Sequence, residues 1–477
     1  MRIGNADSAC LHGNREELDS LDDHLIIKKI IFIHSRIVLN SALPRKAAPG
    51  NTQVNSTMEN YFQTDRPLSG KGLPAGGPWT PSSIAAAGGS ILAEDVSLPV
   101  AVLEEPALRH NLEWMRRFTA TYGVQLAPHG KTTMSPALFR MQLDAGAWGI
   151  TLATAPQAVA AFEHGVRRVL LANQLVGKGN FELIADLQAR DAGFWFACVV
   201  DSADNVAALG RYFAARGQCI KVLLEIGVEG GRTGVRDDAQ AQAVLAETAR
   251  WPGAVALVGV EVYEGVARDE AGVRAVLQRT LAQWRAIRDA GGFARLPAIL
   301  SGAGSAWFDV VAEEFAALAG DADAQVVLRP GCYLTHDVGI YRQAAARIHA
   351  GNPVARGMGE SLRPALRLWA CVQSRPEPGK AIIALGKRDA AFDAGLPVPA
   401  LHYRPDAAAP SEAPAHWQVT AMMDQHAFLE VHADDDLRVG DLLCFDISHP
   451  CLTFDKWRHL LVVDAAHRVV GAVDTCF

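Results

Sequence analysis

Residues 126–136 read Leu-Ala-Pro-His-Gly-Lys-Thr-Thr-Met-Ser-Pro, and they join an apolar run to the start of a helical pattern. Ser135 can cap that helix, and Pro136 suits its first position, where the missing N–H would have no partner in any case. The stretch therefore predicts a strand, a short polar loop and a helix in succession. In parallel α/β folds, loops of this kind at the carboxyl ends of strands carry the chemistry.

Lys131 is the only lysine of that loop. If it is buried, its amine loses a proton more readily, and it can then attack a carbonyl carbon or form a Schiff base. The alternative interpretation is an ordinary surface lysine between a strand and a helix. The rest of the chain has to decide between the two.

The same strand–helix pattern recurs along the chain, with roughly 25–40 residues per unit, the length of a crossover between parallel strands. About eight such units between residues 100 and 345 predict an α/β fold with a TIM-like (β/α)8 barrel. An open, doubly wound sheet is the alternative, but no G-x-G-x-x-G opens an early helix. The predicted strands are Val100–Leu103, Val124–Ala127, Gly149–Leu152, Arg168–Ala172, Phe194–Val200, Lys221–Ile226, Val255–Val262, Ala298–Ser301 and Gln325–Leu328.

Four of these strands run into polar, glycine-rich segments, where a barrel places its active site. Any one of them alone could be a tight turn. The Ser-Gly-Ala-Gly-Ser loop late in the barrel is more specific, because barrels often bind phosphate with backbone N–H groups there, and a neighbouring Tyr and Arg could add donors. The four segments are Gly227–Gly234, Tyr263–Gly265, Ser301–Ser305 and Arg329–Tyr333.

From about residue 363 the pattern changes to alternating, β-branched runs separated by Pro, Gly and Asp turns. This predicts a mostly antiparallel β domain over residues 351–477, following a barrel over residues 91–350. Residues 1–90 are expected to be an extension and linker without stable order, since 66–90 are rich in Gly, Pro and Ser. Leu25–Ile33 is an apolar stretch broken by Lys28 and Lys29, and it is too short to cross a bilayer. We expect residues 1–57 to be dispensable, with Met58 as an alternative start.

The β domain contains the triplet His449-Pro450-Cys451. An imidazole and a thiolate two residues apart can point the same way on an extended chain and share a metal ion, although such a triplet also occurs by chance. Two protein ligands leave the ion incomplete. Water, another side chain such as His426, or a substrate group would complete it, as a catalytic metal requires.

The composition fits a globular enzyme with a large core, since 49% of the 477 residues are hydrophobic and 20% are charged. A net charge of -7 and the lack of a basic stripe argue against nucleic-acid binding. The eight cysteines are scattered without a C-x-x-C, which predicts reduced thiols and a cytoplasmic location rather than a disulfide framework. No membrane partner is expected.

Taken in order, these motifs resemble the D-serine dehydratase-like proteins, or D-amino-acid deaminases. That family is related to D-threonine aldolase within the alanine racemase fold type of pyridoxal-phosphate enzymes. The resemblance covers roughly residues 90–475 and implies an alanine racemase-like barrel packed on a β domain, and a homodimer. It rests on Pro128–Thr132, Arg232–Gly234, Ser301–Ser305, Arg329–Gly331 and His449–Cys451.

The resemblance also implies roles for individual residues. Pyridoxal phosphate would be linked to Lys131, and a divalent metal, expected to be zinc, would be held by His449 and Cys451. Arg232, followed by Thr233, resembles the residue that faces the pyridine nitrogen, and Tyr263 matches an active-site tyrosine near the cofactor. The positions that match the phosphate-binding loops are Gly302, Gly304, Ser305, Gly331 and Tyr333.

Two departures from the family pattern leave the substrate open. Ala127 and Thr133 replace the first Arg and the last His of the usual Arg-Pro-His-x-Lys-Thr-His motif. Residues 384–389 read Ala-Leu-Gly-Lys-Arg-Asp where an Asp-x-Gly-x-Lys pattern is usual. Both changes point to a divergent branch.

The implied activity is a pyridoxal-phosphate- and metal-dependent ammonia-lyase acting on a D-β-hydroxy amino acid such as D-serine or D-threonine. Lys131 would remove the α-proton, the metal would polarise the β-hydroxyl, and the products would be a 2-oxo acid and ammonia. If Arg232 leaves the ring nitrogen unprotonated, the metal has to supply more of the driving force.

Three other activities have to be weighed. The alternative within the same fold is retro-aldol cleavage to glycine and an aldehyde, but the resembling aldolases tend to have Asp at the position of Cys451. Racemisation would need a second base on the opposite face, for which no candidate stands out. A non-catalytic pyridoxal-phosphate carrier of the single-barrel type would lack the β domain and its His449–Cys451 triplet.

Overall fold

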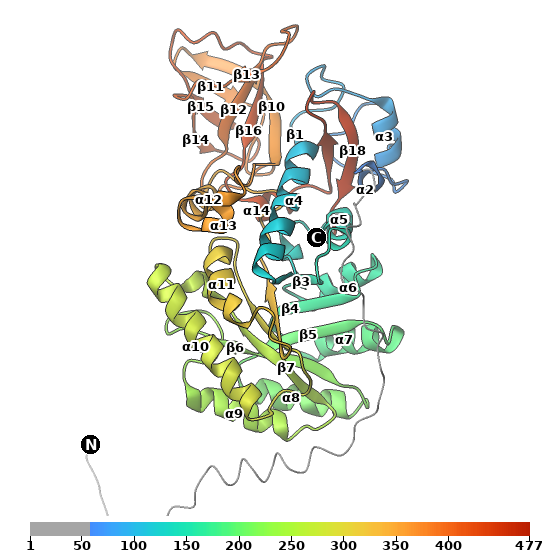
Figure 1. Cartoon of the computed structure of the whole chain (residues 1–477). Helices are drawn as coiled ribbons and strands as arrows, with labels where there is room; N and C mark the ends of the chain where they lie inside the picture. Colours follow the sequence, from blue (N-terminus) through green and yellow to red (C-terminus); the bar gives the residue numbers. More distant parts are fainter. Residues whose placement is uncertain (1–57) are drawn as a thin grey trace, which may run out of the picture. The chain divides into compact units, whose positions relative to one another are not determined.

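The computed structural model describes residues 58–477, which lie within one unit of the chain, residues 53–477. The expectations for residues 1–57 lie outside the described residues. Eight parallel strands form one curled sheet, in the order β3-β4-β5-β6-β7-β8-β9-β2 (Figure 1). They are β2 (Gln125–Leu126), β3 (Ile150–Leu152), β4 (Arg168–Gln174), β5 (Trp195–Val200), β6 (Ile220–Ile226), β7 (Val255–Val262), β8 (Ala298–Gly302) and β9 (Ala324–Leu328).

The two ends of this sheet meet just after β2. His129 forms a parallel bridge with Thr151 of β3, and the Thr151 N–H donates to the Pro128 carbonyl oxygen at 2.9 Å. The Thr151 hydroxyl adds a bond of 2.7 Å to the Ala127 carbonyl oxygen. These contacts close the sheet, so the predicted TIM-like barrel is confirmed.

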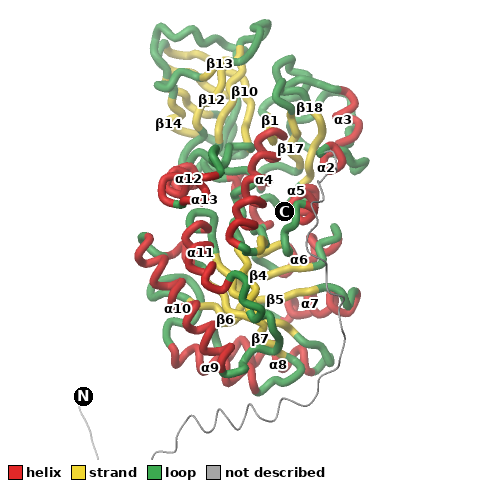
Figure 2. Tube along the Cα trace, in the orientation of Figure 1, coloured by secondary structure: helices red, strands yellow, loops and turns green. Residues whose placement is uncertain are grey.

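Helices follow most of the strands and flank the sheet, as the red segments around the yellow strands of Figure 2 show. Pro136 occupies the first turn of α5 as predicted, but Ser135 makes no side-chain hydrogen bond to that helix. The barrel helices are α4 (Glu105–Tyr122), α5 (Pro136–Asp144), α6 (Ala155–Glu163), α7 (Lys178–Arg190), α8 (Ala203–Ala214), α9 (Asp238–Ala249), α10 (Glu270–Asp289) and α11 (Phe308–Phe315).

The strand interiors alternate between two cores, because successive side chains of a strand point to opposite faces. One set of small and branched residues fills the inside of the barrel, and the opposite set packs under the helices. The barrel is therefore a packed core rather than a pore, and open chemistry is left to the strand ends. The inner set is Ala127, Leu170, Ala197, Val199, Leu223, Val258, Ile299 and Val327.

The second sheet has ten strands and is mostly antiparallel, as predicted. Its main path runs β13-β12-β16-β10-β1-β17-β18, and β11, β15 and β14 branch from β10. Between the two sheets lie α12 (Ile340–Gly351) and α13 (Pro353–Gly357) in sequence. The strands are β1 (Val100–Glu104), β10 (Leu366–Glu377), β11 (Lys380–Ile383), β12 (Val398–Tyr403), β13 (Ser411–Glu412), β14 (Gln418–Met422), β15 (Ala427–Glu430), β16 (Leu442–Asp446), β17 (His459–Val463) and β18 (Val469–Asp474).

The membership of β1 corrects the predicted domain boundary. Val100–Leu103 was expected as the first barrel strand, but β1 pairs antiparallel with β10 and parallel with β17. A short run of buried residues predicts a strand without saying which sheet receives it. The barrel sheet therefore begins at β2, and the β domain includes a strand from before the barrel.

Residues 58–99 also differ from the expected linker. They contain α2 (Glu59–Phe62) and α3 (Pro81–Ala87), and α3 opens with a capping box between Thr80 and Ser83. Phe62 and Ile84 are buried. Their apolar packing orders this segment against the β domain, so the expected lack of order is wrong for residues 58–90. Within residues 58–477, no helix has the length and apolar character needed to cross a membrane.

Candidate active site

Lys131 lies in the short turn η1 (Gly130–Thr132), immediately after β2 at the carboxyl end of the barrel. The Lys131 side chain is exposed, whereas Gly130 and Thr132 on either side of it are buried. A Cβ on Gly130 would lie 2.7 Å from both Ile150 Cγ2 and Phe139 Cε1, so glycine lets the turn rest on the barrel wall. This packing presents the Lys131 amine at the mouth of the barrel.

His129 immediately precedes that turn. Burial, with the positive charges of Lys131, Arg329 and Arg232, holds the pKa of His129 well below its ordinary value. Its Nδ1 atom is buried and has no hydrogen-bond partner among the residues described. The imidazole is therefore neutral, and the three cations that act on it follow three different barrel strands, β2, β6 and β9.

Arg232 and Tyr263 lie together. The Arg232 guanidinium stands 4.2 Å from the centre of the Tyr263 ring, a cation–π contact. Burial and the nearby Glu264 carboxylate raise the pKa of Tyr263, so its hydroxyl keeps its proton at neutral pH. A Cβ on Gly304 would lie 3.0 Å from the Tyr263 ring, so the loop after β8 packs against it. The structure thus groups three residues that the sequence singled out.

The loop over residues 301–305 differs in detail from the predicted phosphate cradle. The N–H groups of Ala303 and Gly304 donate to the carboxylate of Glu264, at 3.1 and 2.6 Å. Glu264 is fully buried, so these two donors are already committed to a protein anion. Gly302 faces α11, where a Cβ would lie 3.0 Å from Val311 Cγ1. Gly302 and Gly304 therefore serve packing and loop shape here.

The loop after β9 brings two backbone N–H donors to one oxygen atom. The N–H groups of Gly331 and Cys332 both donate to the Ser305 hydroxyl oxygen, each at 3.0 Å. A Cβ on Gly331 would lie 2.7 Å from Thr132 Oγ1, so this loop touches the turn that carries Lys131. These two N–H groups and the Ser305 hydroxyl bond to one another here beside the turn that carries Lys131, and as neutral donors they would turn to the phosphate of pyridoxal phosphate when it is bound.

Two further predicted residues bond elsewhere. Tyr333 is buried, and its hydroxyl accepts a hydrogen bond of 3.0 Å from Gln142 Nε2 in α5. Burial raises the pKa of Tyr333 well above its usual value. The Thr233 hydroxyl donates to Glu225 Oε1 at 2.7 Å. Both residues support the walls of the site through these bonds.

A buried Arg–Glu pair lies at the strand ends, and it holds the arginine that the sequence offered as a further anion donor. Arg329 at the end of β9 pairs with Glu261 of β7, and its Nε donates to the Ser301 hydroxyl at 2.9 Å. Burial raises the pKa of Glu261 to about 8, against the opposing effect of Arg329. The signal was present in the sequence, because Glu225 and Glu261 are acidic residues within mostly apolar strands.

His449 and Cys451 lie at the start of α14 (Pro450–Phe454), after β16. His449 Nδ1 is 2.7 Å from Asp393 Oδ2, the type of carboxylate contact that orients a metal-binding imidazole and leaves its Nε2 free. Cys451 Sγ lies 3.5 Å from Thr132 Oγ1. A hydrogen bond with Cys332, followed by the effect of His449, lowers the pKa of Cys451 to about 4. The donors therefore fit a divalent metal that accepts imidazole and thiolate, such as zinc.

The other candidate metal ligands lie away from this site. His426 occupies the exposed turn between β14 and β15. Within residues 58–477, His416, His432 and Asp435 are the one group of three metal-type side chains whose donor atoms all lie within 4.8 Å of one another. Asp435 Oδ2 there accepts hydrogen bonds from His416, from Trp417 and from the His432 N–H, which explains the group as a loop contact.

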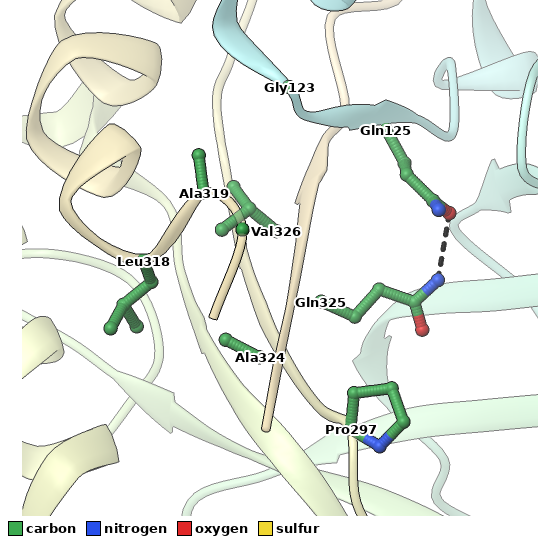
Figure 3. Close-up of a pocket in the computed structure, with 9 residues that line it drawn as sticks. Gly123, Gln125, Pro297, Leu318, Ala319, Ala324, Gln325 and Val326 are labelled. Carbon is green, nitrogen blue, oxygen red and sulfur yellow. Dashed lines mark hydrogen bonds between the residues drawn. The ribbon is translucent and has the colours of Figure 1, made fainter. Parts of the chain in front are cut away.

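A cavity of about 150 Å³ opens at the amino ends of the barrel strands. Figure 3 shows Gln125 and Gln325 at its edge, joined by a hydrogen bond of 2.7 Å from Gln325 Nε2 to Gln125 Oε1. Gln125 begins β2, so the cavity and Lys131 lie at opposite ends of the strands. The cavity is therefore separate from the candidate active site.

Comparisons with known proteins agree with this architecture. Residues 104–335 match the family model of the alanine racemase N-terminal domain, and residues 365–463 match that of a serine dehydratase domain. D-threonine aldolase of Arthrobacter sp is 26% identical over 384 residues, which cover 77% of this chain and 89% of the aldolase. D-threo-3-hydroxyaspartate dehydratase of Delftia sp. (strain HT23) is 32% identical over 140 residues, 29% of this chain and 36% of the dehydratase.

The fold comparison gives the same result. The crystal structure of D-threonine aldolase from Filomicrobium marinum is similar with a TM-score of 0.66 and 26% sequence identity. The match covers 81% of this chain and 97% of that chain. The predicted family resemblance and the two-part fold are thereby confirmed.

Proposed function

The chain belongs to the alanine racemase-fold proteins that carry a C-terminal serine dehydratase domain, and from this premise we propose that it eliminates water from a D-β-hydroxy amino acid. The products would be a 2-oxo acid and ammonia. The observation that carries this proposal is the contact between Thr132 and Cys451, whose Oγ1 and Sγ atoms lie 3.5 Å apart. It brings an amine base and a pair of metal ligands to the same side of the barrel mouth.

In this proposal Lys131 holds pyridoxal phosphate, and the N–H groups of Gly331 and Cys332, with Ser305, hold its phosphate. When bound, pyridoxal phosphate draws electrons from the substrate and makes the α-hydrogen acidic. His449 and Cys451 hold a divalent metal of the zinc type, which when bound would act as a Lewis acid on the β-hydroxyl. The barrel is then the cofactor domain, and the β domain supplies the metal ligands.

The chain's own residues carry out the proton chemistry. Lys131 takes the α-proton in this proposal once bound cofactor and substrate cover it, since its side chain is exposed in this structure and not buried as the sequence interpretation required. Tyr263 keeps its hydroxyl proton and can donate a hydrogen bond to a bound anion or substrate. Arg232, held on the Tyr263 ring, adds positive charge near the neutral His129. The cations favour binding of the substrate carboxylate and the cofactor phosphate.

Retro-aldol cleavage to glycine and an aldehyde is the second candidate. It is favoured by the identity of 26% with the Arthrobacter aldolase over 77% of this chain. In that reaction a base removes the β-hydroxyl proton and the Cα–Cβ bond breaks. Cys451 favours elimination by analogy, since the resembling aldolases tend to have Asp at that position.

The product mixture separates the two reactions. Purified protein with pyridoxal phosphate and zinc is incubated with D-serine, D-threonine and D-threo-3-hydroxyaspartate, and with the L-enantiomers as controls. We expect a 2-oxo acid and ammonia in equal amounts from at least one D-substrate. Glycine with an aldehyde would establish cleavage instead and would refute the dehydratase assignment.

The cofactor assignment is tested with Lys131→Ala. We expect this variant to lose both the product and the visible absorbance of the lysine-linked cofactor. Arg140→Ala, at an exposed position of α5, serves as the control and should keep both. We also propose a homodimer in the cytoplasm; a monomeric mass by light scattering would contradict the dimer.

A further inference from the structure

Cys332 has no role as a ligand in the function proposed above, yet it faces the proposed metal ligands. It follows Gly331 at the end of the barrel strand β9, and its side chain is buried. Its Sγ lies 3.8 Å from Cys451 Sγ, although the two residues are 119 positions apart in the chain. The barrel and the β domain thus each bring one sulfur to the same place.

The sulfur–sulfur distance can be compared with known bonding geometries. A disulfide requires about 2.05 Å between the sulfurs. In a tetrahedral zinc site, two thiolates each about 2.3 Å from the metal subtend about 109° and lie about 3.8 Å apart. The observed 3.8 Å matches the edge of such a tetrahedron.

We propose that Cys332 is a third protein ligand of the metal, beside His449 and Cys451. This inference rests on the proposed function and deepens it. Two thiolates and one imidazole leave a single open position, which is the arrangement of catalytic zinc, and the β-hydroxyl of the substrate would take that position. Thiolate ligands also select zinc over harder cations such as magnesium.

The third ligand of the proposed metal site is the imidazole of His449. Asp393 contacts Nδ1 of His449, which leaves Nε2 to face the metal. The donor atoms of His449, Cys451 and Cys332 do not all lie within 4.8 Å of one another in the residues described. Metal binding therefore draws the half-buried His449 ring toward the two sulfurs. The two sulfur atoms already lie at the separation that a tetrahedral zinc site requires.

The position of Cys332 is fixed by its own backbone. Its N–H and that of Gly331 both donate to Ser305 Oγ at 3.0 Å, and its Sγ is 3.9 Å from Thr132 Oγ1. One short loop therefore carries both a metal ligand and the N–H groups proposed to hold the cofactor phosphate. A change in metal binding at Cys332 would be transmitted directly to that loop.

The test counts sulfur ligands directly. X-ray absorption of the wild-type protein loaded with zinc is expected to show two sulfur neighbours, and one sulfur would overturn the proposal. In protein loaded with Co²⁺, Cys332→Ser is expected to reduce the thiolate-to-cobalt absorption to about half and to weaken metal affinity at least about tenfold. Cys332→Ala should behave alike, and Cys219→Ser, an exposed thiol just before β6 at the opposite end of the barrel strands from Lys131, should not change either quantity.

These outcomes are independent of the product assay. If Cys332→Ser keeps the full cobalt absorption and affinity, Cys332 is not a ligand, even when the wild-type protein forms a 2-oxo acid. If the wild-type protein binds no metal, both this inference and the metal part of the proposed function are refuted. Glycine as the product would overturn the elimination while leaving the sulfur count to decide this inference.

Discussion

Replacing Gly331 with alanine tests whether the loop after β9 fixes the turn that carries Lys131. The new Cβ would lie 2.7 Å from Thr132 Oγ1, 2.9 Å from His129 Cβ and 2.9 Å from the His129 carbonyl oxygen. Non-bonded heavy atoms in packed interiors stay well beyond these distances. Either the loop or the turn therefore has to move.

The energetic cost of the added methyl group depends on which neighbouring atoms can move. Thr132 can rotate its hydroxyl, but two of the contacts involve the main chain of His129 and the Cβ fixed to it. That segment is held by the bridge to Thr151 that closes the barrel. A methyl group forced into such a packed position costs about 1–3 kcal/mol. If it displaces the turn, pyridoxal-phosphate binding weakens by roughly 5- to 150-fold, since 1.4 kcal/mol is about tenfold.

The assay is an absorbance titration with pyridoxal phosphate, together with urea unfolding of the same samples. Gly179→Ala is the matched control, because a Cβ at Gly179 in α7 meets nothing within 4 Å. Alanine should maintain or raise stability there, since it is the better helix former. The reasoning is refuted if Gly331→Ala and Gly179→Ala bind pyridoxal phosphate equally well and unfold at the same urea concentration.

Three further changes have defined outcomes. The depressed pKa of His129 leaves it neutral in the folded protein, while the unfolded chain protonates it below its ordinary value of 6.5. Because the unfolded state then binds more protons, the stability of the wild type falls as the pH drops below 6.5. In urea unfolding down to about pH 5, His129→Gln should lose less stability than the wild type. His426→Gln, at an exposed position, is the control. Ile84→Ala should cost about 2–5 kcal/mol of unfolding free energy, because Ile84 of α3 is buried; no change would mean that residues 66–90 are a free linker after all. A chelator should remove 2-oxo-acid formation but leave the visible cofactor absorbance, and added zinc should restore turnover; turnover that resists the chelator would contradict the role given to His449 and Cys451.

The barrel could be predicted from sequence because its pattern is local and repeated. Each strand–helix unit carries its own apolar periodicity, and the order of the units gives the order of the strands. The positions of Lys131, Arg232 and Tyr263 at strand ends followed from the same pattern. Their roles toward a cofactor remain predictions, which the titration and product assays test.

The parts that could not be predicted depend on partners far away in the sequence. The run Val100–Leu103 has the pattern of a strand, but its pairing with β10 and β17 is decided by packing and not by the run itself. Likewise, the sequence around Gly304 predicts a phosphate donor, yet the buried carboxylate of Glu264 takes its N–H. The spacing of Cys332 and Cys451 also arises only when the barrel and the β domain pack together.

The location of β1 in the second sheet has a consequence for how the chain can be made. β1 lies between β10 and β17, and its Val102 pairs with Arg367 of β10 on one side and with Leu461 of β17 on the other. During synthesis β1 leaves the ribosome long before either neighbour exists. Its two unpaired edges must stay solvent-exposed or shielded until then, which is the condition that invites aggregation.

The same arrangement makes the two sheets inseparable by a single cut. A fragment that begins after residue 350 would lack the strand at the centre of its own sheet and would leave β10 and β17 with open edges. The barrel is therefore an insertion between two pieces of the β domain, and not an independent module that precedes it. Transferring this barrel to another protein would require two junctions, one after β1 and one before β10.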